Sequence, residues 1–168
     1  MKKTYAALGS TIFFFLAPGI VAGLTPWWIG HWRFQYPPWD TRPLHWFGAV
    51  LVAAGLAGLI DCFARFVRDG RGTPAPPMPT ETLVISGLYR YVRNPMYVAV
   101  LAIILGQGLL FGNTGILQYA AIAWICAHLF VLLYEEPILQ HTYGDQYDLY
   151  RTSVPRWLPR LAPWQGQS

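Results

Sequence analysis

Residues 94–134 read NPMYVAVLAIILGQGLLFGNTGILQYAAIAWICAHLFVLLY, a run of 41 residues without a formal charge. A helix crosses the roughly 30 Å hydrocarbon core of a bilayer in about 20 residues, so this run is long enough for two crossings. Near its middle the sequence GNTG, residues 112–115, is typical of a helix end followed by a new helix start. We therefore predict a hairpin of two membrane helices over residues 95–111 and 115–134.

Two more apolar segments precede the hairpin. Residues 5–24 carry no charge over twenty positions, and residues 44–67 form a second segment if Asp61 and Arg65 are accepted within it. Both are long enough to span a bilayer. The sequence thus predicts an all-α, polytopic integral membrane protein with four transmembrane helices, forming a single membrane domain over residues 1–168.

The first segment has an alternative interpretation as a cleaved secretory signal peptide. Lys2 and Lys3 would form its basic start, and residues 21–23 resemble a small-residue cleavage site. The apolar run is longer than that of a usual signal peptide, and Pro18 lies inside it. These features favour a retained membrane helix.

Composition and charge placement exclude several classes of protein. Charged residues make up 12% of the chain and hydrophobic residues 54%, whereas a soluble domain carries about 25% charge. The twelve Lys and Arg are too few and too dispersed for a nucleic-acid-binding stripe, despite the net charge of +4. With a cytoplasmic N-terminus, all cations except Arg33 and Arg42 fall on the cytoplasmic side. This bias predicts an inner or plasma membrane protein with both termini in the cytoplasm.

The segments outside the loop that precedes the hairpin and the tail that follows residue 134 contain few candidate functional residues. Residues 25–43 are expected to form an outer loop whose tryptophans lie at headgroup level, namely Trp27, Trp28, Trp32 and Trp39. Cys62 and Cys126 fall in predicted helices and are interpreted as small buried apolar residues. The four histidines lack metal-ligand spacing, so we predict no metal site.

The motif Gly106-Gln107-Gly108 predicts close helix packing with a hydrogen bond from Gln107 to another helix.

The loop before the hairpin ends in a strong helix start. Asn94 is a preferred N-cap and Pro95 suits the first helical position, so the third helix is expected to begin at the cytoplasmic surface. Arg93 and Tyr97 would flank its positive end. An ordinary capped helix with Arg93 reaching the headgroups is the alternative.

Two adjacent carboxylates, Glu135 and Glu136, follow the last apolar segment. Anions are disfavoured at a helix C-terminus, and ionisable groups at membrane depth usually serve a function. Pro137 disfavours a helical conformation of Glu136 and predicts a kink or a restart. This pair is therefore a candidate functional site.

The tail beyond the carboxylates predicts one more short helix. Residues 143–145, YGD, suggest a stop followed by a new start, and Tyr147 and Tyr150 would share one face. An extended amphipathic segment, residues 154–161, follows. A polar helix lying on anionic headgroups remains the alternative for this tail.

These motifs together resemble a known superfamily. Residues 87–97, GLYRYVRNPMY, look like the G-x-Y-x-x-x-R-H-P-x-Y signature of membrane methyltransferases. The Glu135-Glu136 pair, the Y-G-x-x-Y-x-x-Y spacing of residues 143–150 and the V-P-R of residues 154–156 accompany it. The combination resembles the isoprenylcysteine carboxyl methyltransferase and phospholipid N-methyltransferase superfamily over residues 70–161, which we take as the catalytic region.

The resemblance implies that S-adenosyl-L-methionine binds at the cytoplasmic ends of the last two membrane helices. It implies Arg93 and Glu136 as catalytic residues, and a lipid or lipophilic small molecule as the methyl acceptor. Carboxylates suit the ammonium and ribose hydroxyls of such a cofactor, and tyrosine rings suit its adenine and sulfonium. The cofactor-binding positions that it implies are Leu83, Val84, Tyr89, Asn94, Pro95, Met96, Tyr97, Glu135 and Tyr147.

Three departures bear on the acceptor. Asn94 stands where the family usually has His, Ala99 replaces a frequent glycine, and Val131 stands where the isoprenylcysteine enzymes carry an acceptor-binding arginine. A prenylated cysteine is therefore not the expected acceptor. A carboxylate, a thiol or an amine remains open, and the absence of a histidine base favours the first two.

Two other classes of function remain as alternatives. One is an NADPH-dependent reductase of the sterol-reductase type, whose tail is similar but whose Arg-Asp pair is replaced here by Glu135-Glu136. The other is a non-catalytic membrane scaffold, which Asn94 and Val131 would favour. Methyl transfer separates the scaffold from the enzyme.

Overall fold

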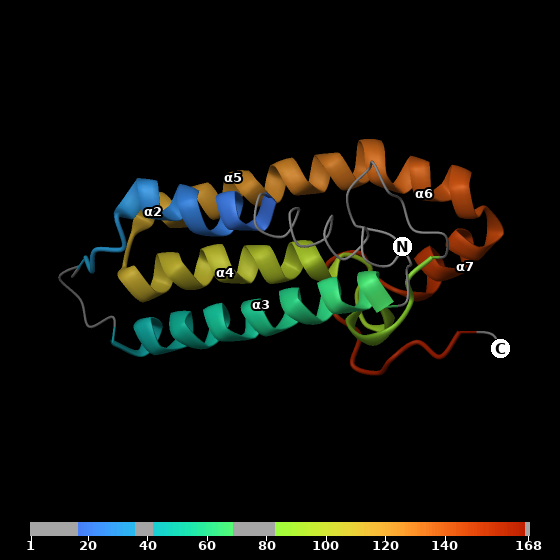
Figure 1. Ribbon diagram of the computed structural model, residues 1–168, viewed down its shortest axis with the longest axis horizontal. Coiled ribbons are helices and arrows are strands. Elements are labelled where there is room, and N and C mark those ends of the chain that lie inside the picture. Colours follow the sequence, from blue (N-terminus) through green and yellow to red (C-terminus); the bar gives the residue numbers. More distant parts are fainter. Residues whose placement is uncertain (1–16, 36–41, 69–82, 167–168) are drawn as a thin grey trace.

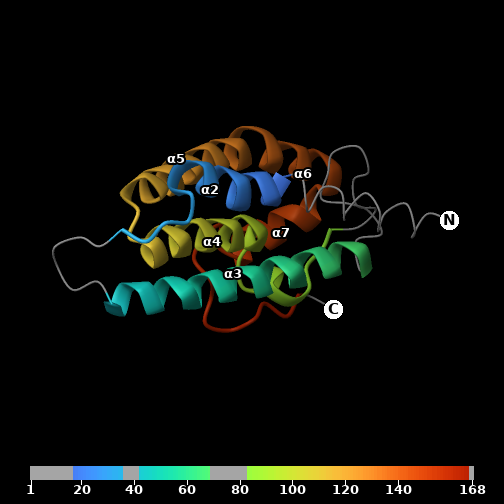
Figure 2. The same cartoon turned by 60° about the vertical axis from the view of Figure 1, so that its left-hand side comes forward.

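The computed structural model describes residues 17–35, 42–68 and 83–166, and the regular structure within these ranges is entirely helical. The all-α prediction is confirmed for this part of the chain. α3, α4 and α5 run side by side along the length of the molecule, and α2 packs against α4 and α5 (Figures 1 and 2). The elements in order are η1 (Ile20–Leu24), α2 (Thr25–Gly30), α3 (Arg42–Arg68), η2 (Gly87–Arg90), α4 (Pro95–Phe111), α5 (Thr114–Phe130), η3 (Val131–Glu135), α6 (Glu136–Tyr143) and α7 (Asp145–Ser153).

Two helical segments, Arg42–Arg65 and Thr114–Tyr143, are long and apolar enough to cross a membrane, and α4 is a shorter apolar helix. Their apolar side chains are largely exposed: Trp46 is 75% exposed and Leu133 is 71% exposed. A soluble bundle would turn such side chains toward its core, so this surface indicates a membrane protein. Of the predicted first helix, residues 5–16 lie outside the described part of the chain.

The hairpin forms as predicted. α4 spans the expected residues and ends at Gly112, whose φ of +64° is a left-handed conformation that glycine adopts without strain. Asn113 then caps α5, because its side-chain oxygen accepts a hydrogen bond from the backbone N–H of Ile116 at 3.1 Å.

The predicted end of the last apolar helix at residue 134 and the predicted non-helical Glu136 are wrong, whereas the expected restart is present as a π turn followed by a new α-helix that begins at Glu136. The helical path continues from α5 through the π-helical turn η3 into α6 and ends only at Tyr143. In η3 the Glu136 N–H bonds to the Val131 carbonyl, one residue further back than in an α-helix. This wider turn accommodates Pro137, which has no N–H to contribute. The predicted stop near Gly144 and the short helix after it are confirmed.

The predicted outer loop also begins too early. The first helix does not end at residue 24 but continues through η1 and α2 to Gly30, with Pro26 tolerated in the first turn of α2. Trp27 and Trp28 are therefore helical and exposed. Trp39 lies outside the described residues.

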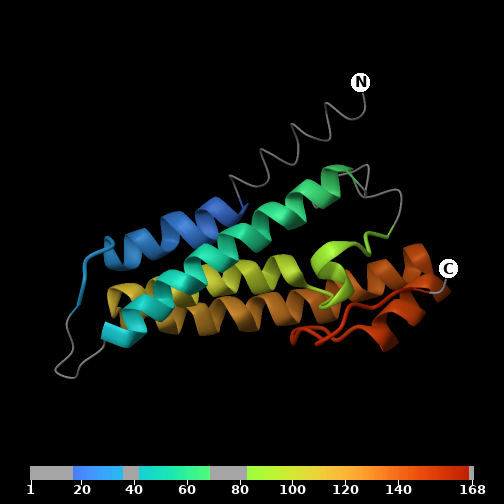
Figure 3. The same cartoon turned by 90° about the horizontal axis from the view of Figure 1, so that it is seen from below.

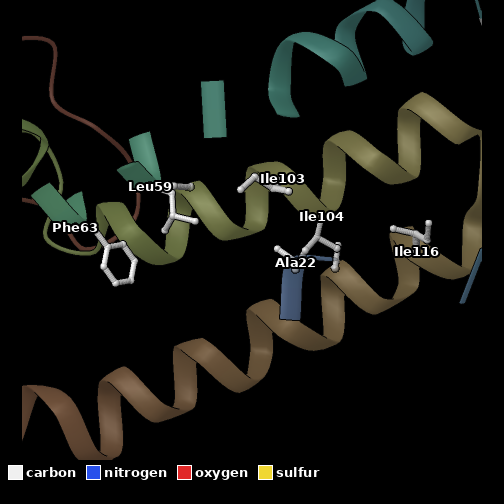
Figure 4. Packing of buried hydrophobic residues seen from close by; sticks show 8 residues of the cluster. Ala22, Leu59, Phe63, Ile103, Ile104 and Ile116 are labelled. Carbon is white, nitrogen blue, oxygen red and sulfur yellow. The ribbon is translucent and has the colours of Figure 1, made fainter. Parts of the chain in front are cut away.

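A compact apolar core joins the helices. Its buried residues come from four elements, and Figure 4 labels Ala22, Leu59, Phe63, Ile103, Ile104 and Ile116. Cys62 is buried as expected, whereas Cys126 is exposed, because its side of α5 faces away from the bundle.

Small residues let α3 and α4 approach closely, as predicted. A Cβ atom at Gly106 would lie 2.7 Å from the carbonyl oxygen of Gly48. The neighbouring Gln107 joins the first helix to α4: its Nε2 donates to the carbonyl of Ala22 at 2.6 Å, and its Oε1 accepts from the indole of Trp32 at 3.0 Å. The Trp32 indole thus bonds within the protein rather than to water at the interface.

One end of the bundle collects the irregular segments. The C-terminal end of α3, the start of α4, and α6 and α7 lie together at this end (Figures 1 and 3). Residues 83–94 and 154–166 pack beside them. The fold therefore brings the predicted site residues to one end, the open end of the hairpin, where α4 begins and the helical path from α5 passes into α6.

Candidate active site at the polar end of the bundle

The start of α4 is tied to the C-terminal segment rather than capped by its own side chain. Asn94 occupies the N-cap position, but its Nδ2 donates to the carbonyl of Arg156 at 3.2 Å. The backbone N–H of Arg93 donates to the carbonyl of Pro155 at 2.9 Å. The carbonyls of Pro155 and Arg156 therefore bind the two residues that precede α4.

A network of charges surrounds Glu136. Arg156 binds both carboxylate oxygens, with Nε at 2.7 Å from Oε1 and Nη2 at 2.8 Å from Oε2. Arg93 Nη1 donates to Oε1 at 2.8 Å and to the hydroxyl of Tyr147 at 3.2 Å. The Arg93 and Glu136 side chains are only 11% and 12% exposed. Such desolvated, bidentate contacts hold α4, α6 and the C-terminal segment in one geometry.

Arg93 has a buried donor without a partner in the described part of the chain. Its Nε is buried and makes no hydrogen bond to any residue in the described part of the chain. Since a buried donor without an acceptor is costly, this atom marks a place where an anionic group would be favourable. The predicted pair of Arg93 and Glu136 is thus brought into direct contact, as part of a larger ion-pair network.

Glu135 points to a different partner. Its Oε2 accepts a hydrogen bond from the hydroxyl of Tyr97 at 2.9 Å, which joins the end of η3 to the first turn of α4. The second oxygen, Oε1, has no hydrogen-bond partner among residues 17–35, 42–68 and 83–166. Glu135 therefore retains the capacity to accept a hydrogen bond from a ligand.

The other predicted cofactor-binding residues lie in apolar packing around this centre. Val84 and Tyr89 pack with Cys62 against the half-buried Met96, and Pro95 is buried at the start of α4. Leu83 packs against a second cluster that contains Tyr147. All the predicted positions thus gather at one end, where Asn94, Tyr97, Glu135 and the charge network around Glu136 make polar contacts.

Three tyrosines of this region are largely buried. Tyr150 donates its hydroxyl to the carbonyl of Tyr89 at 2.7 Å, which links α7 to η2. Burial raises the pKa of Tyr89, Tyr147 and Tyr150, so these phenols stay protonated near neutral pH. The bond to Glu136 likewise raises the pKa of Arg156, which keeps its charge.

The structure adds residues that the sequence did not single out as site residues. Arg156 is the strongest partner of Glu136, and the V-P-R ending was a signal that could have found it. Trp157 donates its indole N–H to Nδ1 of His128 at 3.0 Å, and its ring lies 6.4 Å from that of Tyr97. Trp124 stacks on His128 with ring centroids 5.5 Å apart. No sequence spacing connects α5 with residue 157, so this contact was not foreseeable.

No group of three or more potential metal ligands occurs within the described residues. The polar groups that meet at the centre of this site are those of Glu135, Glu136, Arg93, Arg156, Tyr97 and Tyr147. Such a set suits recognition of a ligand that carries both positive and negative groups.

Comparisons with known proteins show which family this chain resembles. The sequence model of the phospholipid methyltransferase family matches residues 44–146. The chain is 36% identical over 80 residues to protein-S-isoprenylcysteine O-methyltransferase of Schizosaccharomyces pombe, which covers 47% of this chain and 34% of that protein. It is 27% identical over 151 residues to the cobalt-zinc-cadmium resistance protein CzcN of Cupriavidus metallidurans, covering 83% of this chain and 67% of that protein.

The chain spans only about a third of the length of the first of these relatives. The family match, by contrast, covers more than half of this chain and includes all but the first two residues of α3, all of α4 and α5, and both Glu135 and Glu136. The resemblance drawn from the motifs is thereby confirmed: the chain belongs to the phospholipid methyltransferase family, in the superfamily that also contains the isoprenylcysteine methyltransferases.

Proposed function

We propose that this chain is an integral membrane methyltransferase that uses S-adenosyl-L-methionine to methylate a lipophilic acceptor at the cytoplasmic face. Family membership supports the reaction class. The single observation that carries the proposal is Glu135, whose Oε2 is held by Tyr97 while Oε1 is without a partner among the described residues. A positioned carboxylate with a spare oxygen at the mouth of an apolar bundle suits a cationic ligand.

The residues at this end fit such a cofactor. Glu135 would accept a hydrogen bond from its ammonium group or its ribose, and the ring of Tyr97 would contact its adenine or sulfonium. The donor Nε of Arg93, buried without an acceptor in the described part of the chain, suits a carboxylate. When bound, S-adenosylmethionine supplies a methyl group activated by the positively charged sulfur.

The protein's part in the reaction would be positioning and exclusion of water. The Glu136 network fixes the start of α4 against Arg156, and the apolar clusters around Tyr89 and Tyr147 would exclude water from the side of the site that they cover. Methyl transfer needs the donor and the acceptor atom in line, so rigid placement supplies most of the rate enhancement. An acceptor dissolved in the bilayer would reach this end from the side of the helices.

Binding of S-adenosylmethionine tests the cofactor assignment. We expect detergent-purified full-length protein to give a binding heat in calorimetry, and Glu135→Gln to weaken binding at least tenfold. Asp145→Asn, the same chemical change at an exposed position on α7, serves as the matched control and should bind as the parent does. Equal binding by Glu135→Gln and the parent would refute the role of Glu135.

A second measurement tests catalysis. Membranes containing the protein are incubated with methyl-labelled S-adenosylmethionine, and the lipid and small-molecule extract is separated to find the labelled product. A labelled product that is absent with Glu135→Gln supports the enzyme and identifies the acceptor as carboxyl, thiol or amine. Cofactor binding without any transfer favours the scaffold, and binding of NADPH in place of S-adenosylmethionine favours the reductase.

A further inference from the structure

After Arg156, the chain runs along the side of the bundle before it returns to the polar end at Arg160. It is anchored at one end by Arg156, which binds Glu136, and at the other by the backbone N–H of Arg160, which donates to the carbonyl of Tyr91 at 2.9 Å. Between these anchors, Trp157 reaches His128 on α5. Residues 157–161, which we call the tail loop, are therefore held in a defined position.

The contact with His128 sets the depth of the tail loop. His128 precedes Glu135 by seven residues along one helical path. At 1.5 Å per residue it lies about 10 Å further from the polar end, inside the apolar span. Since Trp157 bonds to it, the tail loop begins beside the membrane-facing part of α5 rather than above it.

The side chains of the tail loop are sorted by polarity. Leu158 is 79% exposed and Leu161 is 105% exposed, so neither packs on the protein. The polar residue between them turns inward, because Arg160 Nη1 donates to the carbonyl of Ser153 at 2.9 Å. Two leucines point out while the arginine points back, an arrangement that would be unfavourable in water but favourable at an apolar boundary.

The apolar surface of the tail loop is continuous with that of α5. The ring of Trp157 lies 6.5 Å from that of Trp124, which is itself 45% exposed on α5. Whatever covers the exposed apolar face of α5 would therefore also contact the tail loop. For an apolar helix of this length that occupant is lipid.

We propose that the tail loop is inserted into the membrane, with Leu158 and Leu161 among the acyl chains of lipids beside α5. Burying each leucine in hydrocarbon is favourable, whereas the arginines at both anchors stay bonded to the polar end. The loop would thus bind the lipid surface directly next to Arg156 and the candidate site. This proposal rests on membrane location and is independent of methyl transfer.

Spin labels in lipid vesicles test the insertion. Leu158→Cys and Leu161→Cys, each in a Cys126→Ser background, are labelled with a nitroxide in full-length protein reconstituted in phosphatidylcholine and phosphatidylglycerol vesicles. Collision rates with oxygen, which concentrates in hydrocarbon, and with a water-soluble nickel chelate are then compared. Both leucines are exposed, so the substitutions remove no packing contacts. Ile122→Cys on α5 is the lipid reference and Asp145→Cys on α7 is the aqueous reference.

We expect labels at 158 and 161 to favour oxygen over the nickel chelate several-fold, as the label at 122 does. Nickel accessibility equal to that at 145 would overturn the proposal, because the loop would then lie in water. Low accessibility to both reagents together with spin–spin broadening would also overturn it, since a second copy of the chain would then cover the leucines.

Discussion

At the scale of single residues, two adjacent glutamates have separate partners. Neighbouring positions on a helix point about 100° apart, so Glu135 reaches Tyr97 on α4 while Glu136 faces Arg93 and Arg156. Glu136 has its oxygens occupied by arginine, whereas Glu135 keeps one for a ligand. On this difference we predict that Glu136 contributes mainly to the stability of the site and that Glu135 contributes to ligand recognition.

Arg156→Ala is expected to destabilise the protein by about 1–3 kcal/mol, because a largely buried carboxylate would lose its bidentate partner. Arg156→Lys should restore only part of this loss, since an ammonium cannot bind both oxygens in the same geometry. Thermal unfolding in detergent measures the effect. Arg151→Ala, which removes an exposed ion pair with Asp148, is the control and should change stability by less than about 1 kcal/mol. Equal shifts for Arg156→Ala and Arg151→Ala would contradict the prediction.

Gln107→Leu tests the polar link between the first helix and α4. The change leaves the carbonyl of Ala22 and the indole of Trp32 without their partner, and we expect a loss of about 1 kcal/mol, as for other hydrogen bonds between membrane helices. Gln118→Leu makes the same change at an exposed position on α5 and should be neutral. The thermal unfolding midpoints of the two variants, measured in the same detergent, test this prediction. An unchanged midpoint for Gln107→Leu would mean that the hydrogen bonds of Gln107 do not stabilise the protein.

At the scale of elements, the approach of α3 to α4 depends on glycine. At Gly106 a Cβ atom would meet the Gly48 carbonyl at 2.7 Å and the Val52 backbone nitrogen at 2.8 Å, so neither neighbour can move cheaply. The two helices pack backbone to backbone over this stretch, which suits helices that associate in lipid.

Gly106→Ala should therefore cost about 1–3 kcal/mol through overpacking. Gly23→Ala is the matched control, because nothing lies within 4 Å of its added Cβ; it should be neutral or slightly stabilising. Both are compared by thermal unfolding in the same detergent. A Gly106→Ala variant as stable as Gly23→Ala would show that the helices can separate without loss.

At the scale of the whole molecule, the ends of the bundle differ in character. The candidate site, α6 and α7 lie at one end, while α2 ends near the hairpin turn between α4 and α5 at the other (Figure 1). The distribution of Lys and Arg predicts that the site end faces the cytoplasm.

Labelling of introduced cysteines tests this orientation. Asp145→Cys at the site end and Gln35→Cys at the opposite end are both exposed, and each is made in a Cys126→Ser background. In oriented membranes, a membrane-impermeant thiol reagent should modify position 145 from the cytoplasmic side only and position 35 from the outer side only. Modification of both positions from one side would contradict a crossing of the bundle between them.

Several features could be predicted from the sequence, because they depend on local order. The start of α4 is predicted at the correct residue from Asn94 and Pro95, although the Asn94 side chain does not cap the helix, and the end of α4 follows from a left-handed glycine. The continuation of α5 past Pro137 could not, since the π turn that accommodates the proline is a small shift of hydrogen-bond register that no local propensity specifies. The same holds for residues 25–30, which are expected to belong to the outer loop but are helical.

By itself the sequence determined which segments are apolar enough for a membrane, where the hairpin turns, and which residues carry the candidate chemistry, because partition into lipid and capping depend on nearby residues only. The tertiary structure decided which side chains meet. Glu135 pairs with Tyr97, Arg156 takes both oxygens of Glu136, and Trp157 reaches His128. The two residues of each contact are 38, 20 and 29 positions apart in the sequence, respectively. Whether they meet depends on the rotation and register of the packed helices. Only packing in three dimensions sets those quantities.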